Sequence, residues 1–287
     1  MLIHDGSPSG EILRLWREFH TPVVAFAVTL GLAVAGRIFK AELLAAAAVG
    51  AGVAAGWFVS GDPSFVTGPA FLPGWLQHHR LALMAAGALV LTLAATRFAP
   101  RRGFWPALLL AAFSAGWWLT GAKLTRSAAM DVWLPGLAVA AIVSATGWLI
   151  LAFPGERLRP VMASCTLAAA LHVIGAPWAW SLAALVPGLA AVVPLALPGA
   201  SALAPLAVSL DLAFVEAGVM LSAGRLPRGG LSAGDIAALC PILSLWLLPH
   251  LLPRLRGAGR TAPLIAVLAA GGIGVGIAWL WMRVHGS

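Results

Sequence analysis

Asp211 and Glu216 are the residues whose type and position point most directly to chemistry. They lie in the middle of residues 201–224, a segment that is otherwise apolar and long enough to cross a bilayer. A carboxylate at that depth costs about 2.5–3.5 kcal/mol to insert, so such residues face a bundle interior or an aqueous cavity. We predict that both serve proton coupling or substrate contact in transport. The alternative is a structural role, with each carboxyl group hydrogen-bonded between helices.

The spacing of the two carboxyl groups constrains the helix that carries them. Asp211 and Glu216 are five residues apart in the sequence, which separates them by about 140° around an α-helix. They cannot share one face, so the helix needs protein or water on two sides. This spacing predicts a position at the centre of a helix bundle.

Two histidines, His172 and His250, also lie within apolar segments. They are candidates for a proton relay with the carboxylates, and imidazole is also a ligand of haem and of metals. A haem held across a bundle needs two histidines at matched depth, whereas His172 falls toward the tryptophan-rich side of the predicted bundle and His250 toward the basic side. We therefore predict no cofactor and no metal site. Hydrogen bonding between helices is the plainer alternative for both side chains.

The connection over residues 61–80 combines prolines, aromatic residues and a cationic end. Trp75, His78, His79 and Arg80 lie in its second half, a composition typical of a segment at the membrane interface. The adjacent histidines would point about 100° apart on a helix, and no acidic or cysteine cluster accompanies them. We predict that these four residues contact lipid headgroups rather than a metal.

Motifs for enzymatic chemistry are absent from the sequence. The chain has no Walker motif, serine-hydrolase elbow or HExxH, and the glycine run 271–276 does not match GxGxxG. Cys165 and Cys240 have no ligand spacing and are predicted to pack as small apolar residues. No catalytic residue can be assigned, and an enzyme is the less favoured class.

The elements that must position these residues follow from composition. Of 287 residues, 61% are hydrophobic and 10% are charged, and the mean hydropathy is +0.94. A soluble domain is about half apolar and about a quarter charged, so soluble enzymes, disulfide scaffolds and coiled coils are excluded. We predict an all-α polytopic transmembrane bundle of about 10 spans. The apolar segments cover residues 22–36, 41–60, 81–98, 104–122, 132–153, 161–176, 178–197, 201–224, 233–252 and 262–283.

The basic residues group these segments into helical hairpins. Four short basic loops fall at alternate connections, at Arg37 and Lys40, at residues 97–102, at residues 157–159 and at residues 254–260. The positive-inside tendency places such loops in the cytoplasm, close to anionic headgroups. Most tryptophans map to the opposite side, where we predict an interfacial aromatic belt. Its members are Trp57, Trp75, Trp117, Trp118, Trp133, Trp178, Trp180, Trp279 and Trp281.

Glycine spacing predicts where helices approach closely. Gly52 and Gly56 form a GxxxG pair, and so do Gly272 and Gly276. Small residues four positions apart allow two backbones to come together in a membrane. Both pairs therefore predict tight helix packing rather than nucleotide binding.

The domain organisation is simple because no polar domain interrupts the apolar segments. Residues 1–21 are predicted to be a leader, either an interfacial amphipathic helix or a disordered segment. Residues 22–287 are predicted to form a single transmembrane domain. The net charge of +8 is attributed to cytoplasmic loops that contact anionic lipid, and no nucleic-acid-binding surface is present in the sequence.

Two functions of different classes fit these features. The favoured one is an integral membrane transporter or exporter of a small molecule, with proton coupling through Asp211 and Glu216 as its more specific form. The alternative is a non-catalytic membrane subunit or assembly scaffold of a larger complex, with other membrane proteins as partners. A lipid-modifying enzyme is a third option without an assignable catalytic set. The expected location is the inner (cytoplasmic) membrane of a bacterium, crossed several times.

Overall fold

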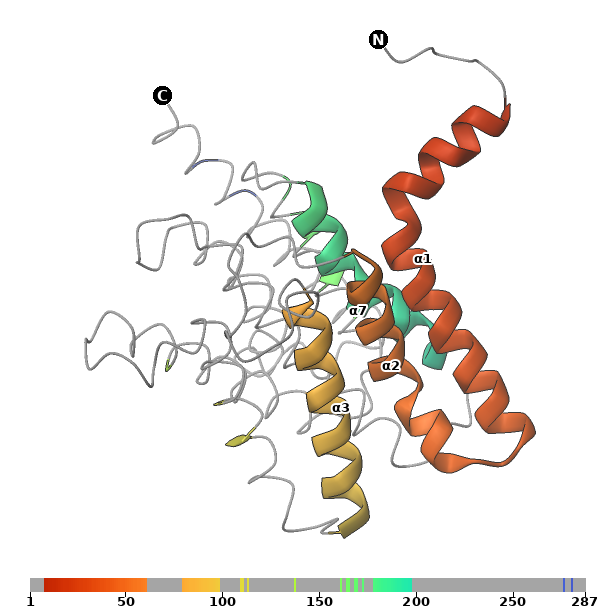
Figure 1. Cartoon of the computed structure of the whole chain (residues 1–287), viewed down its shortest axis with the longest axis vertical. Helices are drawn as coiled ribbons and strands as arrows, with labels where there is room; N and C mark the ends of the chain where they lie inside the picture. The colour runs from red at the N-terminus through yellow and green to blue at the C-terminus, as the bar shows by residue number, and fades with distance from the viewer. Residues whose placement is uncertain are drawn as a thin grey trace, which may run out of the picture.

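The computed structural model describes residues 8–60, 79–98 and 178–197, together with residues 109, 110, 113, 137, 161, 164, 165, 168, 169, 172, 276 and 280. The described chain is entirely helical and contains no strand. Its helices are α1 (Pro8–Ile38), α2 (Glu42–Ser60), α3 (Arg80–Phe98) and α7 (Trp178–Ala196). Figure 1 shows α1 and α2 as an antiparallel hairpin with α3 beside α2.

Three helices are long and apolar enough to cross a membrane. These segments are Phe19–Ile38 within α1, Glu42–Ser60 and Trp178–Ala196. Each is 19 or 20 residues long, which matches the roughly 20 residues needed to cross about 30 Å of hydrocarbon. In α3, Leu81–Leu91 forms a shorter apolar helical stretch. The described chain therefore has the helices of a membrane protein.

The predicted segments 41–60, 81–98 and 178–197 are confirmed as the helices α2, α3 and α7, with ends that differ by one residue or less. That α3 crosses the membrane stays a prediction. Segment 22–36 lies inside α1, which begins much earlier, at Pro8, and continues unbroken through the predicted leader. The contact of residues 8–21 with a membrane interface stays a prediction. The segments 104–122, 132–153, 161–176, 201–224, 233–252 and 262–283 lie outside the described residues, apart from a few single positions.

Pro22 explains the shape of α1. Proline has no amide hydrogen and its ring crowds the preceding turn, so it bends a helix that contains it. Pro22 lies inside α1, and in Figure 1 the N-terminal third of this helix leans away from the other helices. The bend separates a polar helical arm from the apolar segment Phe19–Ile38.

The turn between α1 and α2 is closed by backbone hydrogen bonds at the end of α1. The amide of Ala41 donates to the carbonyl of Gly36 at 2.8 Å, and the amide of Lys40 donates to the carbonyl of Arg37 at 3.4 Å. This pair of bonds defines a Schellman motif, in which the residue after the cap adopts the left-handed conformation. Lys40 occupies that position with φ of 51°, although glycine is the residue that adopts it without strain.

Lys40→Gly is therefore expected to stabilise the hairpin. A side chain in the left-handed region costs about 1 kcal/mol, and glycine removes most of that cost after its own loss of chain entropy. Thermal unfolding of the detergent-solubilised protein should show a higher Tm. Lys40→Ala removes the same charge but keeps a Cβ atom, so it should not raise the Tm. An equal gain in both variants would attribute the effect to charge instead of backbone strain.

The core of the hairpin is built from small residues, as the first GxxxG pair predicts. A Cβ atom on Gly52 would overlap Thr29 Oγ1 and lie 2.6 Å from the carbonyl oxygen of Ala25. A Cβ atom on Gly56 would lie 2.8 Å from Ala25 Cβ and 3.0 Å from the carbonyl oxygen of Thr21. The glycines of α2 thus pack on a stripe of small residues four apart on α1. Close packing at Gly52 and Gly56 is confirmed.

The second GxxxG pair lacks such support in the described residues. Gly276 has no described atom within 4 Å of its ideal Cβ position, and Gly272 is not described. Close packing of this pair stays a prediction.

The buried hydroxyl group of Thr29 is hydrogen-bonded within its own helix, α1. Thr29 is fully buried and its hydroxyl donates to the carbonyl of Ala25 at 2.7 Å, one turn earlier. This bond back to the helix backbone removes the cost of an unpaired hydroxyl in an apolar core. The hydroxyl is therefore already paired where it faces Gly52 of α2.

Candidate functional site

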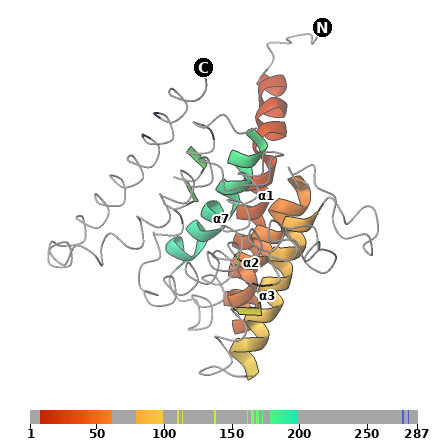
Figure 2. The same ribbon diagram turned by 90° about the vertical axis from the view of Figure 1, so that its left-hand side faces the viewer.

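Helix α7 is the most deeply buried of the three apolar helices. In its apolar window 61% of the residues are buried, against 44% in α2 and 28% in α1. Figure 2 shows α7 crossing the other helices at an angle, whereas α1, α2 and α3 run roughly side by side. A helix buried to this extent lies within a bundle, and its polar atoms are shielded from water and lipid.

Two prolines interrupt the hydrogen-bond ladder of α7. Pro187 is buried and Pro194 is half-buried, and both lie inside the helix. Because proline lacks an amide hydrogen, the carbonyl groups four residues earlier, at Ala183 and Ala190, lose their helical donors. Proline is tolerated inside a membrane helix such as α7 when neighbouring groups satisfy the released carbonyls.

Trp57 of α2 satisfies the first of these carbonyls. Its indole nitrogen Nε1 donates to the carbonyl oxygen of Ala183 at 2.9 Å, and the side chain is only 1% exposed. The adjacent residue Gly56 brings α7 close, since a Cβ atom there would lie 3.1 Å from Val186 Cγ1. Tight glycine packing and the indole hydrogen bond together fix α7 on the hairpin.

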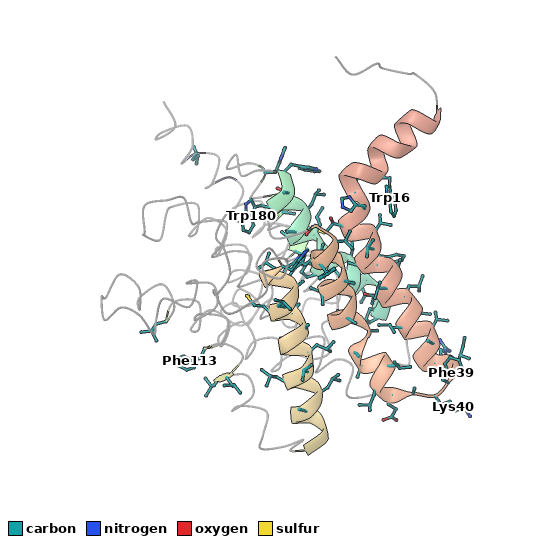
Figure 3. All side chains as sticks on the ribbon, in the orientation of Figure 1. Trp16, Phe39, Lys40, Phe113 and Trp180 are labelled. Carbon is teal, nitrogen blue, oxygen red and sulfur yellow. The ribbon has the colours of Figure 1, made fainter. Side chains whose placement is uncertain are left out.

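The burial of Trp57 corrects the predicted aromatic belt. Trp57 and Trp180 are 1% and 6% exposed, so both lie within the protein instead of facing an interface. Trp180 projects from α7 on the side away from α1 (Figure 3). Trp178, at 44% exposure, is the described member of the belt that retains an open surface. Tryptophan fits both settings because its apolar body carries one hydrogen-bond donor.

Rings from four parts of the chain gather at one end of the described helices. We call this the aromatic end, defined by Phe19, Phe58, His79, His172 and Trp178. Phe19 and His172 meet Trp178 edge to face, with ring centroids 6.1 Å and 5.6 Å apart. From this end α1 and α7 both run toward the opposite end of the described helices in Figures 1 and 2, so the two helices run in the same general direction. The three crossings predicted between residues 98 and 178 require that direction.

His79 is half-buried at the aromatic end. Its ring stacks on Phe58 with centroids 4.3 Å apart and an interplanar angle of 21°. Its Nδ1 atom is buried without a hydrogen-bond partner in the structure. The ring therefore packs on the end of α2, and headgroup contact through its other nitrogen stays a prediction.

His172 is one of the predicted site residues that the structure describes. It is exposed, and its ring meets that of Trp178 edge to face. No contact with a carboxylate is described for it, so its role in a proton relay stays a prediction.

The other predicted site residues are not placed. Arg80 begins α3, but its side chain is not described. Trp75, His78, Asp211, Glu216 and His250 lie outside the described residues.

The described residues offer no metal centre. No group of three or more His, Cys, Asp or Glu side chains gathers within the described parts of the chain. Cys165 is exposed, which corrects its predicted burial as a small apolar residue. The opposite end of the hairpin carries the exposed charged residues Arg37, Lys40 and Glu42, as Figure 3 shows for Lys40 at the turn.

The fold and the contacts define an α-helical membrane protein with a buried, proline-interrupted helix packed on a small-residue hairpin. Comparison with known proteins adds no relative: no family model, no curated protein and no solved structure matches the chain.

Proposed function

We propose that the chain is a multi-pass transporter or exporter of a small molecule in a bacterial inner membrane, coupled to protons through Asp211 and Glu216. The observation that carries the proposal is the placement of two carboxylates in an apolar segment that directly follows α7 in the sequence. Intramembrane carboxylates mark ion and substrate paths because their burial is costly without such a role.

The proline-interrupted helix adds a second line of support. Transporters commonly place their sites beside discontinuous helices, where unwound backbone lines a cavity and helix halves move. Pro187 and Pro194 remove two amide donors from α7, the helix immediately before the carboxylate-bearing segment. The exposed Arg37 and Lys40 at the turn between α1 and α2 fit a cytoplasmic loop near anionic lipid.

The competing function is a non-catalytic subunit of a larger membrane complex. An exposed apolar face on α1 favours it, formed by Val23, Phe26, Leu30 and Val34. Such a face suits a partner helix as well as lipid. The two functions differ in two measurable ways. A subunit purifies together with partner proteins, whereas a transporter moves protons as the purified chain alone.

The test begins with purification in mild detergent. A transporter is expected as a particle of this chain alone, a monomer or a homo-oligomer of the 29.5 kDa polypeptide. The protein is then reconstituted in liposomes that contain a pH-sensitive dye, and pools of small metabolites are added outside. One pool should trigger proton movement that empty liposomes lack. Stoichiometric companions in the preparation, with no pool triggering proton movement, would contradict the proposal and favour the subunit.

A further inference from the structure

The carbonyl group of Ala183 has an unusual position within α7. Ala183 is fully buried, and the residue four positions later is Pro187, which has no amide hydrogen to donate. A buried carbonyl without a donor is costly, because neither water nor lipid replaces the lost bond. A helix in this state bends or recruits a donor from elsewhere.

The donor comes from a different helix. Trp57 lies 126 residues away in the sequence and donates from Nε1 to the Ala183 carbonyl at 2.9 Å. Both groups are shielded, so no water competes for the bond. The indole N–H of α2 thus occupies the place of the amide that Pro187 removes.

The described contacts of α7 differ on the two sides of Pro187. Before the proline, Trp178 meets Phe19 of α1 and Val186 meets Gly56 of α2. Directly after it, Gly188 packs against Ser164, whose Cβ would lie 2.7 Å from a Cβ atom on that glycine. The N-terminal part is anchored on the hairpin, and the first residue beyond the proline contacts another segment.

We propose that Pro187 is a hinge in α7 and that Trp57 is the latch that holds the hinge in the conformation of this structure. When the indole N–H leaves the Ala183 carbonyl, the part of α7 after Pro187 is free to change its angle relative to the part before it. Trp57 is a positioning residue in this device. This motion of α7 does not require that the protein be a transporter.

The test is a double-mutant cycle on the full chain in lipid nanodiscs. Spin labels are attached to cysteines at Ala179 and Ala196, two exposed positions near the ends of α7, after Cys165 and Cys240 are replaced by serine. The distribution of distances between the labels is measured in four backgrounds: Pro187 and Trp57 intact, Trp57→Phe, Pro187→Ala, and both changes together. Trp57→Phe keeps an aromatic ring but removes the N–H donor.

Trp57→Phe is expected to broaden the distance distribution and to lower the Tm. In the double variant the amide of residue 187 is restored and donates to Ala183 within the helix, so the narrow distribution returns. The Tm loss caused by Trp57→Phe should then fall to less than half of its value in the presence of Pro187, which is the signature of coupling between the two sites.

Two outcomes would overturn the latch. A narrow distribution in Trp57→Phe alone would show that the hydrogen bond does not restrain α7. A double variant as broad and as unstable as Trp57→Phe would show that the indole acts only by filling space. If Trp57→Phe fails to fold, the double variant decides: recovery of a folded, monodisperse protein supports the latch, and failure of both overturns it.

Discussion

Gly52→Leu is expected to prevent α1 and α2 from packing as a hairpin. Even a Cβ atom at this position would overlap Thr29 Oγ1 and lie 2.6 Å from the carbonyl oxygen of Ala25. The carbonyl belongs to the backbone, so the clash is relieved only if the two helices separate. Forcing extra atoms into a well-packed core typically costs about 1–3 kcal/mol, and a leucine against backbone should reach or exceed the upper end. The variant should show a large loss of Tm in detergent and poor recovery from membranes.

Gly31→Leu provides the matched control. Gly31 is an exposed glycine of α1 with no described atom within 4 Å of its ideal Cβ position, and the substitution adds the same atoms to an apolar helix. Helix propensity alone favours leucine over glycine by nearly 1 kcal/mol, so the Tm should stay level or rise. A similar loss in both variants would mean that leucine disturbs membrane insertion generally, and the packing argument at Gly52 would fail.

Helix positions could be predicted from the sequence wherever apolar length alone decides them. The segments 41–60 and 178–197 are bounded by charged or turn-forming residues, and the helices α2 and α7 end within one residue of those limits. The spacing of Gly52 and Gly56 also predicts close packing against another helix, because small residues four apart lie on one face of a helix. What the sequence does not give is the partner, which is the stripe of Thr21, Ala25 and Thr29 on α1.

Trp57 shows why the site is harder to predict than the helices. A tryptophan near the end of an apolar segment is equally suited to two environments, the membrane interface and the protein interior. The choice depends on a carbonyl released by Pro187, 130 positions further along the chain, and on a close approach that only Gly56 permits. A proline inside an apolar segment signals a carbonyl in need of a donor, but the donor is fixed by three-dimensional packing.

The start of α1 at Pro8 is not predicted from the sequence, for a different reason. Charged residues at positions 11–18 make this part of the chain polar, and Pro22 lies four residues after the last of them, so the hydropathy pattern predicts that the apolar helix begins only after the leader. Yet α1 is continuous from Pro8 to Ile38. Proline removes one hydrogen bond from a helix and bends it. A long helix continues through the proline when the residues before and after it favour the helical conformation.

Glu216→Gln is expected to abolish substrate-driven proton movement while leaving the protein folded. Glutamine keeps the shape and most of the hydrogen bonding of a protonated carboxyl group but cannot exchange a proton. Neutralising a carboxylate within a bilayer also removes an insertion cost of about 2.5–3.5 kcal/mol, so expression and Tm should stay near those of the unmodified protein or rise. Asp211→Asn makes the same comparison at the other carboxylate. The measurement is dye-reported proton flux in liposomes with the metabolite pool that drives the unmodified chain.

The transporter and the subunit predict different effects of substitutions at Asp211 and Glu216 on activity and on stability. A carboxyl group that serves only as a link between helices contributes hydrogen bonds worth about 0.6 kcal/mol each. Its change to alanine would then loosen the bundle, whereas the amide variants would restore most of the stability and any partner binding. A proton-coupling group behaves the other way: Glu216→Ala and Glu216→Gln should be equally inactive and similarly stable. Full proton flux with unchanged pH dependence in both Glu216→Gln and Asp211→Asn would end the coupling hypothesis, because no other acidic residue lies within residues 201–224 to take over the proton.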